Sequence, residues 1–141
     1  RMTEGENMKF LIKRKRLIIA VLCAALIWIV MYLFILPSYV VDRIEKANFV
    51  DVWYGEICYQ TDDAEDISAL LDGIGITNWK RTWTTNMQHL GLPDAYITVE
   101  QKYNMDFWIE EEKCYIKIYF HSSNIEIASY YINVSQFKIS S

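Results

Sequence analysis

One long apolar segment near the N-terminus constrains the fold of this chain more than any other feature. Residues 17–36 are twenty consecutive residues without a charged side chain. A helix of that length, at about 1.5 Å per residue, spans the hydrocarbon core of a bilayer, which is about 30 Å thick. Trp28 and Tyr32 lie in its second half, where aromatic rings approach a membrane interface, and Pro37 follows it as a stop. The segment therefore predicts one transmembrane helix.

A cleaved signal peptide and a buried helix of a soluble protein are the alternatives for this segment. The apolar region of a signal peptide usually has about 7–15 residues and ends in small residues at the cleavage site. Here the apolar run is longer, and it ends in Phe34-Ile35-Leu36-Pro37. The length and the bulky end favour a retained membrane anchor.

The charges before the apolar segment indicate its orientation. Residues 1–16 contain six basic and two acidic residues, a net charge of +4. Because basic residues beside a transmembrane helix remain in the cytoplasm, we expect the rest of the chain outside it. The predicted parts are a basic cytoplasmic tail (1–16), a transmembrane helix (17–36), a juxtamembrane linker or helix continuation (37–46) and an extracytoplasmic domain (47–141).

The part of the chain after the apolar segment is acidic. From Pro37 onward it has eight Lys and Arg against sixteen Asp and Glu, a net charge of −8. This charge excludes nucleic acid as a partner, because phosphates require a basic surface. The predicted partners are the lipid bilayer and a membrane or secreted protein that is basic or neutral.

Residue patterns in the acidic part predict an α+β domain. Asp62, as an N-cap, and Glu65 precede apolar residues at helical spacing that run to Ile74, and two glycines end this helix. Strands are predicted where β-branched and aromatic residues gather: Phe49–Gln60, with a break at Gly55, Trp79–Thr85, Ala95–Gln101, Met105–Glu110, Cys114–His121 and Ile125–Ile132. The order of these elements indicates a small antiparallel sheet with one helix packed on a face.

Alternation within the predicted strands indicates which side chains share a face. In the segment Cys114–His121 the even-numbered residues are Cys, Ile, Ile and Phe, which suit a core, whereas the odd-numbered ones are Tyr, Lys, Tyr and His. We expect the second set to belong to an open face, rich in Tyr and Trp, that binds another protein. Its predicted residues are Tyr96, Trp108, Tyr115, Lys117, Tyr119 and Tyr130. A plain half-exposed surface, to which tyrosine is also suited, is the alternative.

Two cysteines, Cys58 and Cys114, lie in the part expected outside the cytoplasm, where a disulfide can persist. A bridge between them would close a long loop and stabilise the domain by about 4 kcal/mol in the chain-entropy model. Two free buried thiols are the alternative. The sequence leaves both open.

Motifs for catalysis or metal binding do not occur in the sequence. His89 and His121 are the only histidines, and neither has a partner at the spacing of a metal site. The acidic run Asp62–Asp66 lacks the central glycine of a calcium loop and suits the charged first turn of a helix. There is no Gly-x-Ser-x-Gly elbow and no glycine-rich phosphate loop. The sequence predicts a protein that is not an enzyme, with no catalytic residues, no metal and no cofactor.

Three short motifs follow the basic tail and the apolar segment: Thr61-Asp62-Asp63 at the helix start, Lys80-Arg81-Thr82 and Leu92-Pro93-Asp94. With them, residues 44–139 resemble uncharacterised anchored or lipidated proteins of Gram-positive bacteria, which share a domain of unknown function. The resemblance implies a membrane-attached extracytoplasmic domain and brings no activity with it. The topology also resembles that of membrane-anchored immunity proteins, which neutralise toxins secreted by other bacteria.

These observations predict a single-pass membrane protein whose extracytoplasmic domain binds another protein, as an accessory subunit of a membrane transporter or sensor complex. The anchor, the lack of catalytic motifs and the Tyr and Trp pattern favour this function. A membrane-anchored immunity protein that neutralises a secreted toxin is the alternative, since an acidic domain suits a basic toxin.

Overall fold

The computed structural model describes residues 3–83 and 90–139, in two compact units, 1–36 and 37–141. The first unit is helical: α1 covers Glu4–Val30, and a short π-helical stretch, η1, covers Met31–Ile35. Thr3 caps α1, because its hydroxyl accepts from the Glu6 amide and the Glu6 carboxylate accepts from the Thr3 amide. No side chain of α1 is buried. The helix that begins at Glu4 is long and apolar enough to cross a membrane, as the sequence predicts.

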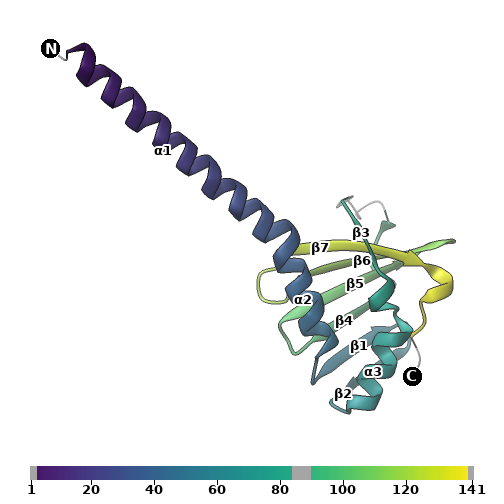
Figure 1. Cartoon of the computed structure of the whole chain (residues 1–141). Helices are drawn as coiled ribbons and strands as arrows, with labels where there is room; N and C mark the ends of the chain where they lie inside the picture. Colours follow the sequence, from purple (N-terminus) through teal and green to yellow (C-terminus); the bar gives the residue numbers. More distant parts are fainter. Residues whose placement is uncertain (1–2, 84–89, 140–141) are drawn as a thin grey trace. The chain divides into compact units, whose positions relative to one another are not determined.

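Among its described residues, the second unit contains the helices α2 and α3, a seven-stranded sheet and the short 3₁₀ turns η2 and η4 (Figure 1). In chain order the elements are α2 (Leu36–Glu45), β1 (Val50–Tyr54), β2 (Ile57–Thr61), α3 (Ala64–Gly73), η2 (Ile76–Asn78), β3 (Lys80–Thr82), β4 (Ala95–Val99), β5 (Tyr103–Ile109), β6 (Lys113–Phe120), β7 (Glu126–Asn133) and η4 (Val134–Gln136). The predicted α+β class, with an apolar N-terminal helix before an antiparallel sheet, is confirmed.

All neighbouring strands of the sheet are antiparallel, in the order β2-β1-β4-β5-β6-β7-β3. The predicted strand Phe49–Gln60 is a hairpin, in which Gly55 and Glu56 form the turn between β1 and β2. Gly55 has a φ of +57°, which glycine adopts without steric cost, and a glycine first in a two-residue turn suits the twist of a hairpin. The expected strand Trp79–Thr85 corresponds to β3, and its last two residues lie outside the described part.

The helix α3 forms where the sequence predicts one, with its cap one residue later. The Asp63 carboxylate, rather than that of Asp62, accepts from the amides of Glu65 and Asp66, at 2.8 and 3.1 Å. The apolar residues at helical spacing in and just after α3 are buried: Ile67, Leu70, Leu71 and Ile74. These side chains form the inner surface of α3.

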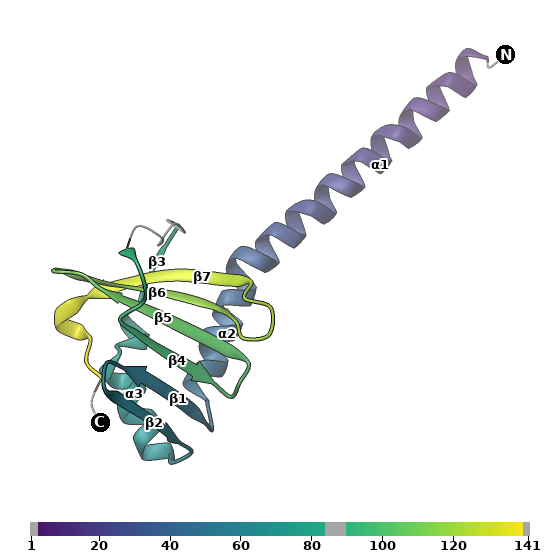
Figure 2. The ribbon, with the colours of Figure 1, turned by 180° about the vertical axis from the view of Figure 1, so that it is seen from behind.

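Both α2 and α3 lie on the same face of the sheet, as the two opposite views show (Figures 1 and 2). Of the two forms predicted for residues 37–46, a linker or a helix continuation, the structure has the second. These residues are largely helical, and Pro37, Val40 and Ile44 are buried. We call the side under the two helices the covered face. Its buried strand residues are Val50, Val52, Ala95, Ile97, Val99, Met105, Phe107, Cys114, Ile116, Ile118, Ala128 and Ile132. This face holds the core of the domain.

Candidate functional site

The other side of the sheet, which we call the open face, carries polar and aromatic side chains. Neither α2 nor α3 lies over it (Figure 2). Antiparallel register assigns nineteen strand residues to it: Asp51, Trp53, Cys58, Gln60, Lys80, Thr82, Tyr96, Thr98, Asn104, Asp106, Trp108, Lys113, Tyr115, Lys117, Tyr119, Glu126, Ser129, Tyr131 and Asn133. Five of the six residues predicted for a binding face, all but Tyr130, are among them. Their role in binding remains a prediction.

Two aromatic rings of the open face stack on neighbouring strands. Trp53 on β1 lies directly across from Tyr96 on β4, with ring centroids 5.6 Å apart and planes 11° from parallel. Trp53 is 43% exposed and Tyr96 is 40% exposed. Aromatic rings in this state present a rigid, partly apolar surface that loses little entropy on binding. Sequence analysis missed Trp53, although alternation with the buried Val50 and Val52 would have identified it.

A hydrogen-bonded chain of polar side chains crosses the middle of the open face. The Tyr119 hydroxyl donates to Asp106 Oδ1 at 3.0 Å, and His121 Nδ1 lies 2.9 Å from Asn104 Oδ1. Partial burial raises the pKa of the Asp106 carboxyl, an effect that the Tyr119 hydroxyl and the Lys117 ammonium oppose. Burial also raises the pKa of Tyr119, with Asp106 next in importance, so the phenol stays protonated and donates. The network orients these side chains.

Trp108 belongs to the open face by register, but it is not available to a partner. The residue is 6% exposed, and its Nε1 donates to the carbonyl of Gly91 at 3.0 Å. Asp94 holds the same loop against the sheet, because its carboxylate accepts from the Ile109 amide at 2.7 Å. Trp108 therefore supports the loop and contributes little contact area.

Tyr130 lies on the covered face, which corrects its predicted place on the binding face. It pairs with Ile116, and its ring lies 5.6 Å from that of Trp79. The pairing of β6 with β7 shifts register between Ile118 and Tyr119, so that β7 carries one extra residue there. A bulge reverses the alternation beyond it, and Tyr131 takes the open position instead.

The two cysteines of the domain are free and lie on opposite faces, so of the two alternatives left open by the sequence the structure has free thiols, one of them exposed rather than buried. Cys58 is exposed on the open face, whereas Cys114 is fully buried on the covered face. Burial, and then the charge of Asp94, raises the pKa of the Cys114 thiol to about 12. This thiol is therefore protonated and unreactive at neutral pH.

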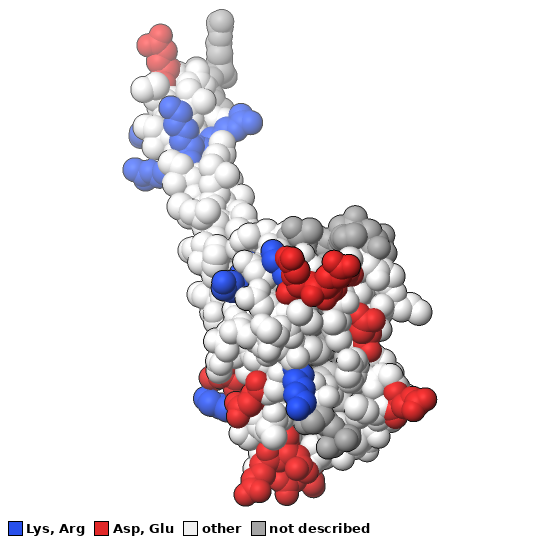
Figure 3. Space-filling model, turned by 90° about the vertical axis from the view of Figure 1, so that its right-hand side faces the viewer, with Lys and Arg blue, Asp and Glu red and all other residues white. Residues whose placement is uncertain are grey.

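Acidic side chains dominate the surface of the domain. Figure 3 shows several clusters of Asp and Glu on one side of it and few Lys or Arg. One run, Glu110–Glu112, is exposed in the connection from β5 to β6, and another, Asp62–Asp66, lies around the start of α3. Within residues 3–83 and 90–139, no three His, Cys, Asp or Glu side chains lie close enough together to hold a metal ion. His89 lies outside the described residues.

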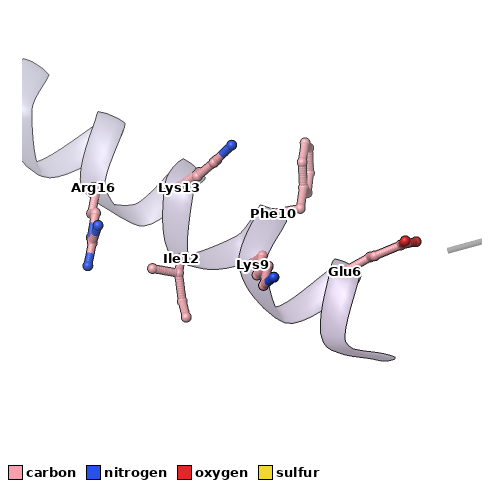
Figure 4. A pocket seen from close by; sticks show the side chains of 6 residues that line it. All are labelled: Glu6, Lys9, Phe10, Ile12, Lys13 and Arg16. Carbon is pink, nitrogen blue, oxygen red and sulfur yellow. The ribbon is translucent and has the colours of Figure 1, made fainter. Parts of the chain in front are cut away.

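A hollow on the N-terminal helix carries no site. Its lining side chains are Glu6, Lys9, Phe10, Ile12, Lys13 and Arg16. All six project from successive turns of α1 (Figure 4), so the hollow is the space between neighbours on one helix.

Neither a protein-family model, nor a curated protein, nor a solved structure matches this chain, so no function carries over from a relative.

Proposed function

We propose that this chain is a membrane-anchored protein whose sheet domain lies outside the cytoplasm and binds another protein through its open face. The observation that carries this proposal is the contrast between the faces. Two helices cover one side, whereas the other side exposes the stacked rings of Trp53 and Tyr96 without a helix above them. An accessory subunit of a membrane transporter or sensor complex has these parts.

The anchor and its flanking charge support the location of the domain. The helix that begins at Glu4 is long and apolar enough to span a bilayer, and the six basic residues of 1–16 precede its apolar part. By the positive-inside rule, the N-terminus then stays in the cytoplasm and the domain lies outside. The bilayer is thus the first partner of the chain.

Cys58 provides a direct test of this orientation. It is the exposed thiol of the domain, whereas Cys114 is buried and Cys23 lies in the apolar segment. A membrane-impermeant maleimide should label Cys58 in intact protoplasts, and Cys58→Ser should abolish the label. Labelling that appears only after the cells are lysed would mean that the domain is cytoplasmic.

Partner recovery tests the open face itself. The full-length protein, tagged at its C-terminus, is purified in mild detergent from its own membrane, and bound proteins are identified by mass spectrometry. A Trp53→Ala/Tyr96→Ala double variant should lose the partner. Ile125→Ala is the matched control, because Ile125 is an exposed apolar residue, 53% accessible, outside the open face. Unchanged recovery by a folded double variant would refute the assignment of this surface.

The acidic charge of the domain keeps immunity to a toxin as the second candidate function. Eight basic residues against sixteen acidic ones favour a basic partner. Recovery of a secreted basic toxin, together with protection of cells from it, would decide for immunity. Recovery of a stoichiometric membrane protein would decide for an accessory subunit.

A further inference from the structure

The outer strand β2 has main-chain groups that face away from the sheet. The amide of Glu100 donates to the carbonyl of Phe49 at 3.0 Å, so Phe49 faces the β4 side of β1. Successive residues of a strand point their main-chain groups to alternate sides. The even-numbered residues of β1, from Val50 to Tyr54, therefore hydrogen-bond to β2.

The same alternation decides which residues of β2 face outward. Ile57, Tyr59 and Thr61 lie across from the even-numbered residues of β1 and share hydrogen bonds with them. The amides and carbonyls of Cys58 and Gln60 consequently point to the free edge. Among the described residues, no other backbone group bonds to these four groups. They are free to bind an added strand.

The free edge lacks the features with which sheets usually prevent pairing. Proteins block exposed edges with Lys, Pro, a bulge or a covering element. The strand Ile57–Thr61 contains no charged residue and no proline, and it pairs with β1 without a register shift. Figures 1 and 2 show β2 as the outermost strand at this end of the sheet. An extended segment can add here by main-chain hydrogen bonds.

The negative charge around this edge favours a basic segment as the added strand. Residues 47–79, which contain β1, β2 and α3, hold seven Asp and Glu and no Lys or Arg. Glu56 and Asp62 flank the strand and are exposed. Symmetric antiparallel pairing of two copies about Tyr59 would bring Glu56 of one copy across from Asp62 of the other, which is repulsive. A basic strand from another protein avoids this repulsion.

The open face beside β2 offers a place for one basic side chain of such a strand. Cys58 on β2 lies directly across from Trp53 on β1, and the Trp53 ring stacks on Tyr96 of the next strand, β4. An added strand would lie about 10 Å from β1, because strands are spaced by about 4.8 Å. The small Cys58 side chain leaves the space between them open, and an arginine is long enough to lay its guanidinium on the Trp53 ring.

We propose that the free edge of β2 binds an extended, arginine-containing segment of a partner protein as an added strand, with one arginine stacked on Trp53. This inference rests on the proposed function, because Trp53 belongs to both surfaces, and it adds the edge and the chemistry of the partner. Main-chain hydrogen bonds to Cys58 and Gln60 supply affinity, and the acidic surroundings supply selectivity.

Gln60→Pro tests the edge, because the Gln60 amide faces outward. The proline ring removes that donor and occupies the space of an added strand, yet the ladder between β2 and β1 keeps its hydrogen bonds. Gln60→Ala is the matched control, since it keeps the amide. Circular dichroism melts establish that both variants fold.

The binding probe is a fluorescein-labelled peptide of about nine residues in which Arg alternates with Thr. Its anisotropy is measured against the full-length protein in neutral maltoside micelles, with a Glu-for-Arg peptide as the charge control. The Arg peptide should bind wild type and Gln60→Ala alike. Its affinity should fall by about tenfold or more for Gln60→Pro and, through the lost stacking, severalfold for Trp53→Ala. The Glu peptide should not bind.

Three results would overturn the inference. The first is equal affinity of the Arg peptide for Gln60→Pro and Gln60→Ala. The second is that the Arg peptide shows no saturable binding. The third is that the wild type sediments as a dimer and Gln60→Pro sediments as a monomer. The last result would assign the edge to a second copy of the chain. If Gln60→Pro leaves both peptide binding and partner recovery intact while the Trp53→Ala/Tyr96→Ala variant loses the partner, the open-face function stands without the edge.

Discussion

The two faces of one sheet contrast sharply in this protein. On the covered face, strand residues such as Ile97, Phe107 and Ile116 are fully buried. On the open face, Trp53 and Tyr96 are about two-fifths exposed, and a polar network takes the place of a second core. The covered face accounts for stability, because burial of apolar area is the main favourable contribution to folding. The open face contributes less to this burial and keeps its aromatic rings partly exposed.

The two cysteines should show the largest difference between the faces. In a Cys23→Ser background at pH 8, a maleimide should modify exposed Cys58 within minutes and leave Cys114 intact. Because burial raises the pKa of the Cys114 thiol to about 12, its rate should be lower by about a hundredfold or more. Mass spectrometry of the folded protein counts the labels, and unfolding in denaturant should make Cys114 react as well. Equal rates in the folded protein would break the contrast.

Removing one aromatic ring from each face compares how much the two faces contribute to the free energy of unfolding. Phe107 is fully buried, and its ring lies 5.3 Å from that of Phe137. Phe107→Ala should lower the free energy of unfolding by about 3–5 kcal/mol, since it leaves a cavity. Tyr96→Ala should cost about 1 kcal/mol or less, mainly through lost stacking on Trp53. Urea unfolding measures both, and comparable losses would show that the open face also carries a core.

Alanine substitutions at two glycines with positive φ distinguish the cost of steric crowding from the cost of backbone strain. Both positions carry the strain, but only Gly75 is also crowded. A Cβ on Gly75 would collide with the Ile132 side chain and approach the Gln136 carbonyl to 2.9 Å, whereas one on Gly55 meets nothing within 4 Å. Gly75→Ala should destabilise the domain by about 2–4 kcal/mol, and Gly55→Ala by about 1 kcal/mol. Thermal melts compare them. A smaller effect at Gly75 would mean that the end of the chain packs loosely there.

Asp106 gives the smallest expected effect, and one that depends on pH. Burial raises the pKa of this carboxyl above 3.8, so the folded state disfavours its ionised form. Its contribution to stability is therefore greatest below pH 3.8 and is lost as the pH rises through the folded-state pKa. Asp106→Asn keeps an oxygen that accepts from Tyr119 and stays neutral.

The stability difference between Asp106→Asn and wild type, measured by urea unfolding from pH 3.5 to 7, should shift in favour of the variant as the pH rises. Glu111→Gln, at an exposed position in the connection from β5 to β6, is the control that removes a carboxylate elsewhere on the domain. A shift in the opposite direction would mean that Tyr119 and Lys117 outweigh burial.

Much of this fold could be predicted from local sequence signals. The apolar run of residues 17–36, the capped amphipathic helix α3 and the strands around Cys114–His121 each carry a strong pattern over neighbouring residues. Alternation also placed Tyr96, Tyr115, Lys117 and Tyr119 on one face. These predictions held because each depends on periodicity within one element.

What the sequence left open or did not predict correctly depended on relations between elements. Tyr130 reached the covered face because a bulge between β6 and β7 reversed the alternation of β7 beyond it. Cys58 and Cys114 could not pair because register sends their side chains to opposite faces of the sheet. Trp108 is buried because a loop distant in sequence, at Gly91, folds over it. None of these is visible in the residues around each position.

By itself the sequence determined that residues 17–36 form a helix long and apolar enough to span a membrane, that the rest of the chain is acidic, and the type of most elements, since these follow from local composition and periodicity. Tertiary structure alone decided that β2 is an edge with outward-facing amides, that Trp53 and Tyr96 stack beside it, and that both helices cover the same face. Strand order and register are properties of pairing between distant segments, and they arise only when hydrogen bonds and burial are satisfied together across the whole sheet.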